Sequence, residues 1–253
     1  MTAFMVPLLL LAVGAAVFLP APADARARVL QHLLGVTVQL LAAGSAAVLL
    51  AQAARGYGRG ERERRVWLLS AAAAAAWALG LLVYAATEWS GQPRAYPSAA
   101  DGFLVAASLI LAAALADEFR LVRPMLTRGQ RLLLVFAGLA LWGVVIGRFM
   151  WPIVAAPLAS TEKGLGLFYA SSVALLFPLA LGPVVAFRGG ASGYVWMGVA
   201  AGVLALAAAN LGFAYLTTYD LYSAAHPINL LRVAGLASLG ASAAWQRRTI
   251  EAL

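Results

Sequence analysis

Polar side chains that could bind a ligand lie near one end of several long apolar runs. They offer carboxylates, guanidinium groups, an amide, a phenol and an imidazole, and they are Glu88, Asp101, Arg148, Asn210, Tyr215, Asp220, His226 and Arg232. Charged groups at membrane depth are costly, so they face a bundle interior, a cavity or an interface. If helices bring the three acids opposite Arg148 and Arg232, opposite charges pair there and form a ligand-binding pocket.

A structural explanation of the same residues stays open. Arg148 and Arg232 could extend to lipid headgroups, and the acids could be solvated loop residues. Arg232 lies deeper in its apolar run, which favours an internal partner. Asp101 follows Pro97 and Ser98 and could cap a helix that begins there.

Patterns for catalysis or metal binding are scarce. The chain has no cysteine, which excludes disulfides, thiolate catalysis and iron–sulfur clusters. It also lacks an HExxH pair, a phosphate loop and a GxSxG elbow. His32 and His226 fall near the same side and could ligate a haem or a metal, although nothing in their spacing requires it. We therefore predict no catalytic residues and no cofactor.

Membrane helices must position these side chains. Hydrophobic residues make up 63% of the 253 residues and charged residues 11%, against roughly 45–50% and about 25% in soluble domains. About 20 apolar residues span a bilayer. Eight such runs occur, at residues 4–19, 29–54, 66–87, 102–116, 132–152, 164–187, 194–216 and 227–245. The sequence predicts an all-α, polytopic transmembrane bundle of eight helices in a single integral membrane domain, residues 1–253.

Two of these runs are less regular. The run at residues 102–116 is short for a span. The run at residues 4–19 is followed by Ala21-Pro22-Ala23-Asp24-Ala25, which resembles a signal-peptide cleavage site. No Lys or Arg precedes it, so a retained first helix is the favoured interpretation.

The arginines predict the orientation. They gather in the segments 55–65 and 117–131, at Arg188, and at Arg247 and Arg248. An eight-helix count puts all four positions on one side, which the positive-inside rule makes cytoplasmic. Both termini are then cytoplasmic, in a multi-pass protein of the cell membrane. The net charge of +8 comes from arginines that lie between apolar runs, so we predict no nucleic-acid binding.

Small and aromatic residues predict packing and depth. Gly143 with Gly147, and Gly198 with Gly202, have the spacing of close helix contacts. Aromatic residues fall at the predicted boundaries, as in an interfacial belt. They are Trp89, Tyr96, Trp151, Tyr219 and Tyr222 at the outer boundary and Trp67, Trp196 and Trp245 at the inner one.

The segment Tyr96-Pro97-Ser98-Ala99-Ala100-Asp101 contains a PSxAD element that opens a helix. With Asn210-Leu211-Gly212-Phe213-Ala214-Tyr215 and the alanine-rich last span, it resembles the multipass N-terminal sensory region of bacterial GGDEF and EAL cyclic-di-GMP signalling proteins. The resemblance covers the chain from about Trp67 onward. Asn210 stands where an Asp is commoner in that family, and no GGDEF or EAL domain follows. The resemblance implies a sensory or ligand-binding module embedded in a bacterial inner membrane; it does not imply cyclase activity.

Three functions follow from these patterns. The first is a non-enzymatic sensory or ligand-binding module with an outward-facing polar pocket. It would take a small-molecule or lipid ligand and signal through cytoplasmic loops or a protein partner at the cytoplasmic face. The second is a structural subunit of a larger membrane complex. The third is a small membrane enzyme whose outer carboxylates act on lipid headgroups.

Overall fold

The computed structural model describes residues 2–90, 96–188, 190–223 and 225–251, and for residues 2, 3 and 88 it describes the backbone alone. These residues form α-helices joined by short connections, with a 3-10 turn η1 (Arg123–Met125) and a π-helical turn η2 (Ile146–Met150). The helices are α1 (Thr2–Phe18), α2 (Ala25–Ala54), α3 (Arg62–Trp89), α4 (Ala99–Val122), α5 (Arg128–Val145), α6 (Trp151–Ala155), α7 (Ser160–Ala186), α8 (Ala191–Thr218) and α9 (Ile228–Glu251).

Local capping signals set where several helices begin. At the start of α2, the Asp24 carboxylate accepts a hydrogen bond from the Ala27 N–H at 2.7 Å. At the start of α5, Thr127 and Gln130 satisfy each other's backbone N–H through their side chains. Such caps supply partners for the N–H groups that a helix start leaves unpaired.

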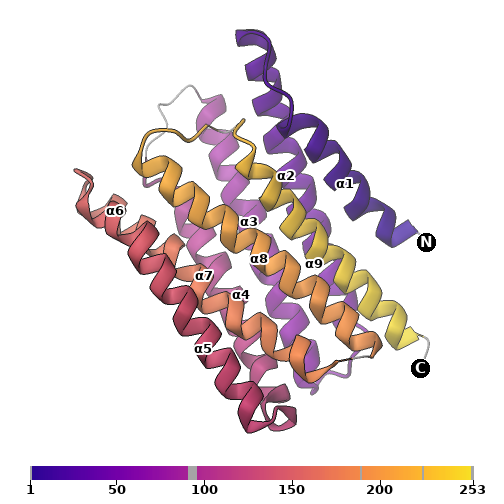
Figure 1. The fold of residues 1–253 in the computed structure, drawn as a ribbon. Helices are drawn as coiled ribbons and strands as arrows, with labels where there is room; N and C mark the ends of the chain where they lie inside the picture. Colours follow the sequence, from indigo (N-terminus) through magenta and orange to yellow (C-terminus); the bar gives the residue numbers. More distant parts are fainter. Residues whose placement is uncertain (1, 91–95, 189, 224, 252–253) are drawn as a thin grey trace.

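Six helices form a closed ring. Each helix contacts the next in the order α2, α3, α4, α7, α8 and α9, and α9 also contacts α2. Outside this ring, α1 packs against α2 and α9, and α5 packs against α7 (Figure 1). The short helix α6 continues α5 through η2. The interior of the ring is therefore where polar side chains from distant segments can meet.

The chain is an integral, multi-pass membrane protein. In the described parts of the chain, seven segments are long and apolar enough to cross a bilayer, and α5, η2 and α6 together form one of them, Arg128–Ala155. The helix over Phe4–Phe18 is shorter, so the eighth span stays a prediction.

The fourth helix is longer than the short apolar run that predicted it. The run at residues 102–116 becomes α4, Ala99–Val122. Ser98 and Asp101 start the helix early with a capping box, and the buried face continues through Glu118 and Val122.

Both ends of the chain lie at the same end of the bundle (Figure 1). The Phe4 ring lies 6.1 Å from that of Trp245, and the Arg248 guanidinium lies 4.5 Å from the Phe4 centroid. We call this the basic end, because it also carries the arginines of the α2–α3 and α4–α5 connections; the opposite end is the Asp101 end. That the basic end faces the cytoplasm stays a prediction.

The two glycine pairs behave differently. A Cβ atom on Gly202 would lie 2.8 Å from the Gly235 carbonyl oxygen, and one on Gly198 would overlap the Ser242 hydroxyl. This pair confirms the predicted close contact, between α8 and α9. Around Gly143 and Gly147 nothing lies within 4 Å of such an atom, so the pair on α5 forms no seam within the described chain.

We expect Gly202→Leu to destabilise the bundle by about 1–3 kcal/mol, because the added side chain must push α8 away from α9. The measurement is thermal unfolding of purified protein in detergent. Gly143→Leu is the matched control and should change the midpoint little, because its new side chain meets open space. Equal midpoint shifts in the two variants would contradict the assigned seam.

Candidate functional site

A polar and aromatic cluster fills the ring interior at the Asp101 end. Its members are Asp101 of α4, Tyr169 of α7, Phe213 of α8, Tyr222 before α9, and Asn229 and Arg232 of α9. We call this set the Asp101-end cluster.

Asp101 is 2% exposed and fully engaged. One carboxylate oxygen accepts a hydrogen bond from the Tyr169 hydroxyl at 3.0 Å. The other accepts from the Ser98 N–H at 2.8 Å and from the Ser98 hydroxyl at 3.0 Å. The predicted helix-capping role is therefore confirmed, and Asp101 also ties α4 to α7.

Arg232 is 7% exposed and is held by neutral groups. One terminal nitrogen donates to the Asn229 side-chain oxygen at 2.9 Å and to the Tyr222 hydroxyl at 3.2 Å. Its Cζ lies 5.0 Å from the Phe213 ring centroid, a cation–π distance. Within the described residues no carboxylate forms an ion pair with it. The predicted internal environment of Arg232 is present, without a paired acid there.

Aromatic rings join the two charged residues. Phe213 lies edge-on to Tyr169 at 5.7 Å and to Tyr222 at 4.7 Å between centroids. Tyr96 packs on the same ring at 5.9 Å, and burial, followed by the nearby Asp101 carboxylate, raises the pKa of Tyr96 above its ordinary value. Tyr96 and Tyr222 were predicted in the interfacial belt; instead both rings pack against Phe213. Trp89 and Trp151 are exposed, as belt residues are.

The other predicted site residues are dispersed around this end. Asn210 is buried on α8, close in sequence to Phe213. Tyr215 packs against Phe149 and Tyr219 instead of joining the cluster. Arg148 is exposed on η2, and Asp220 is exposed in the turn after α8. The Glu88 side chain lies outside the described residues. The structure thus unites Asp101 with Arg232 and leaves Arg148 and Asp220 apart from them.

The two histidines, His32 and His226, lie in different segments of the chain. The Nδ1 atom of His226 accepts a hydrogen bond from the Ile228 N–H at 3.1 Å, at the start of α9. His32 lies half-buried on α2. No group of three or more His, Cys, Asp and Glu side chains in the described parts of the chain is placed to hold a metal ion.

A separate pocket lies at the basic end, with a volume of about 350 Å³. Its walls come from the α2–α3 connection, α3, α4, η1, the α7–α8 connection, α8 and α9. The lining residues are Tyr57, Glu63, Trp67, Glu118, Leu121, Val122, Met125, Phe187, Ser192, Trp196 and Gln246. We call it the Glu118 pocket.

Glu118 is the unusual side chain of this pocket. It is only 5% exposed, and it forms no hydrogen bond or ion pair with the described residues. Its sequence neighbour Asp117 is paired with Arg65 at 3.0 Å and with Arg120 at 3.3 Å. Glu63 lines the same pocket and adds a second negative charge near Glu118. The pocket therefore brings two carboxyl groups together at an otherwise arginine-rich end.

Aromatic side chains wall the Glu118 pocket. Trp67 is 3% exposed and Trp196 6% exposed, with ring centroids 6.0 Å apart. Both were predicted in the inner belt, and that prediction is wrong because they face the ring interior. Tyr57 accepts a hydrogen bond from the Gln246 amide, which joins the α2–α3 connection to α9. Burial raises the pKa of Tyr57, so the phenol stays neutral at physiological pH.

The predicted site residues lie toward the other end, and Glu118 is not among them. A signal for it existed in the spacing of α4. Leu111, Leu115, Glu118 and Val122 follow one another at intervals of four, three and four residues, and all four are buried. That spacing puts Glu118 on the buried helix face, whereas a count of charges assigns it to a cytoplasmic loop.

No protein-family model matches the sequence, and comparisons with curated proteins and with solved structures give no match. The resemblance to cyclic-di-GMP sensory regions therefore stays a prediction. The described residues form two distinct features: a packed polar network at the Asp101 end and a carboxylate-bearing aromatic pocket at the basic end.

Proposed function

We propose that this chain is a membrane-embedded sensory or ligand-binding module whose ligand is a small organic cation bound in the Glu118 pocket. The observation that carries the proposal is a buried carboxylate that lines a pocket and has no partner among the described residues. Removing a carboxylate from water without a partner costs several kcal/mol. A bound cation supplies that partner.

The other walls suit the same ligand class. The faces of Trp67, Trp196 and Tyr57 attract a desolvated ammonium group, and tryptophan does so most strongly. Glu63 adds charge of the required sign, and none of the described arginines and lysines lines the pocket. A volume of about 350 Å³ is within the range of small-molecule sites. A primary or quaternary amine fits these features better than an anion or a sugar.

The position of the pocket also suits a sensor. Its walls belong to four helices of the ring, to η1 and to two connections at the basic end. A ligand that binds one packing of these elements better than another shifts the population between the two. The change would reach the exposed arginines of the α2–α3 connection and the end of α9, where a protein partner could detect it.

Ammonium ions of increasing size provide the direct test. Thermal unfolding of the full chain in detergent is measured with ammonium, methylammonium and tetramethylammonium chloride, each against sodium chloride at equal ionic strength. At about 100 times its Kd, a ligand that binds only the folded state adds about 2.7 kcal/mol, which raises the midpoint by roughly 5–10 °C in a chain of this size. If every ammonium salt matches sodium chloride, the proposed ligand class is wrong.

A further inference from the structure

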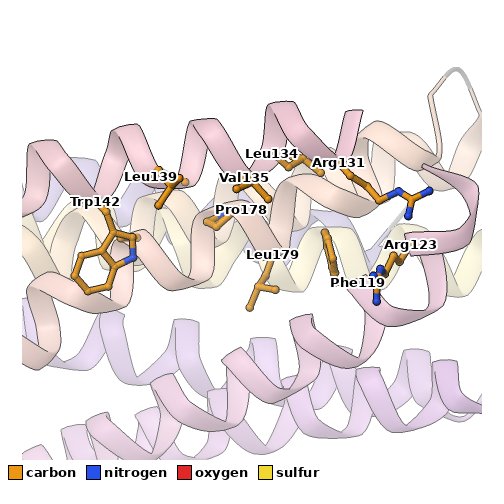
Figure 2. A pocket seen from close by; sticks show the side chains of 11 residues that line it. Phe119, Arg123, Arg131, Leu134, Val135, Leu139, Trp142, Pro178 and Leu179 are labelled. Carbon is orange, nitrogen blue, oxygen red and sulfur yellow. The ribbon is translucent and has the colours of Figure 1, made fainter. Parts of the chain in front are cut away.

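A second cavity lies on the outside of the ring, where α5 packs against α7 beside the end of α4. It has a volume of about 480 Å³, and its lining includes Arg123, Arg131, Leu134, Gly138, Trp142 and Pro178 (Figure 2). We call it the α5 groove. It shares no residue with the Glu118 pocket.

The long wall of the groove is apolar and runs along one helix face. Leu134, Gly138 and Trp142 follow one another at intervals of four residues on α5. From Arg131 to Trp142 the helix rises about 16 Å at about 1.5 Å per residue. Pro178 of α7 faces Gly138, where an added Cβ atom would lie 3.4 Å away. The wall is long enough for the first part of an acyl chain.

One end of the groove is positively charged. Figure 2 shows Arg123 and Arg131 at that end and Trp142 at the other. The Nε atom of Arg131 donates to the Leu126 carbonyl oxygen at 3.1 Å, which orients the guanidinium. Neither arginine forms an ion pair within the described residues. Two unneutralised guanidinium groups thus stand beside an apolar channel at the basic end of the bundle.

We infer that the α5 groove binds one anionic phospholipid, with its phosphate between Arg123 and Arg131 and an acyl chain along α5 toward Trp142. Charge complementarity selects this occupant: guanidinium groups bind phosphate oxygens strongly, and a lipid supplies the phosphate and the chain in one molecule. The outer position of α5, which packs mainly on α7, lets a lipid enter from the bilayer. The bound lipid fills the space between α5 and α7.

Native mass spectrometry of the full chain in detergent tests this. Dissociation constants are measured for phosphatidylglycerol and for phosphatidylcholine of the same acyl composition. Wild type should bind one phosphatidylglycerol at least about 10-fold more tightly than phosphatidylcholine. Replacing both arginines, Arg123→Gln with Arg131→Gln, should weaken phosphatidylglycerol binding about 25-fold, since each arginine near a membrane surface contributes roughly fivefold. The matched control, Arg59→Gln with Arg62→Gln, removes the same charge from exposed positions at the same end and should retain the bound lipid.

A third variant separates the groove from general surface charge. Gly138→Leu fills the channel without changing any charge and should also expel the lipid, whereas Gly143→Leu adds the same group to an open face and should not. Equal losses in the two double-arginine variants, equal affinity for both lipids, or unchanged binding in Gly138→Leu would overturn the inference. Ammonium-induced stabilisation at the Glu118 pocket is measured in the same variants and should persist.

Discussion

Glu118→Gln should make the ligand-free protein more stable and insensitive to organic cations. The wild-type carboxylate is buried without a partner among the described residues, and a glutamine of nearly equal shape removes its charge. We expect a gain of about 2 kcal/mol, or a midpoint roughly 4–8 °C higher. The stabilisation that an ammonium ligand gives to the wild type should disappear. Thermal unfolding at pH 8, with and without tetramethylammonium chloride, measures both effects.

Glu61→Gln is the control for this variant. Glu61 is exposed at the same end and does not line the Glu118 pocket, so its replacement removes one charge from the same region without touching the site. Its midpoint and its response to tetramethylammonium should equal those of the wild type. If Glu118→Gln is destabilised and still responds to the cation, Glu118 is a structural residue and the proposed site is incorrect.

Asp101→Asn should have the opposite effect and destabilise the fold. Asp101 accepts three hydrogen bonds, two from Ser98 and one from Tyr169, while it is almost fully buried. An asparagine has one accepting oxygen, so a buried donor loses its partner at a cost of about 1–3 kcal/mol. The helix start also loses a negative charge that favours it. We expect a total loss of about 3 kcal/mol, seen as a midpoint roughly 6–12 °C lower.

Asp220→Asn is the matched replacement at the same end. Asp220 is exposed and has a φ of 55°, a conformation that asparagine also adopts. The substitution should leave the midpoint within about 1 °C of wild type. A midpoint in Asp101→Asn that equals that of Asp220→Asn would show that the buried hydrogen bonds do not stabilise the bundle. Ammonium binding should persist in Asp101→Asn at temperatures where it stays folded, because the Glu118 pocket lies at the other end.

These two variants assign different roles to the two ends of the bundle. At the Asp101 end the polar side chains bond to one another, so replacing one leaves another unsatisfied and stability falls. At the basic end Glu118 has no such partner within the described chain, so replacing it relieves a cost and removes a ligand contact. Opposite signs of the stability change would therefore distinguish a structural network from a binding site.

The amino-acid sequence alone was sufficient for the class of the protein and for the position of every long helix. Spans are set by the length of apolar runs against the thickness of a bilayer, and this is a local property. The Ser98–Asp101 cap was also predictable, because both residues lie within one turn of the same helix. The contact at Gly202 was predicted by spacing, although the same spacing at Gly143 has no neighbour.

Tertiary structure decided which polar and aromatic residues meet. Asp101 and Tyr169 are 68 positions apart and bond directly, and Trp67 and Trp196 meet across the ring, although each was assigned separately to a boundary. The unpartnered state of Glu118 depends on what α3, α8 and α9 bring to its face of α4, which no local pattern contains. Charge and hydropathy report how deep a residue lies along a helix; only the packing of the ring determines whether it faces lipid, another side chain or a pocket.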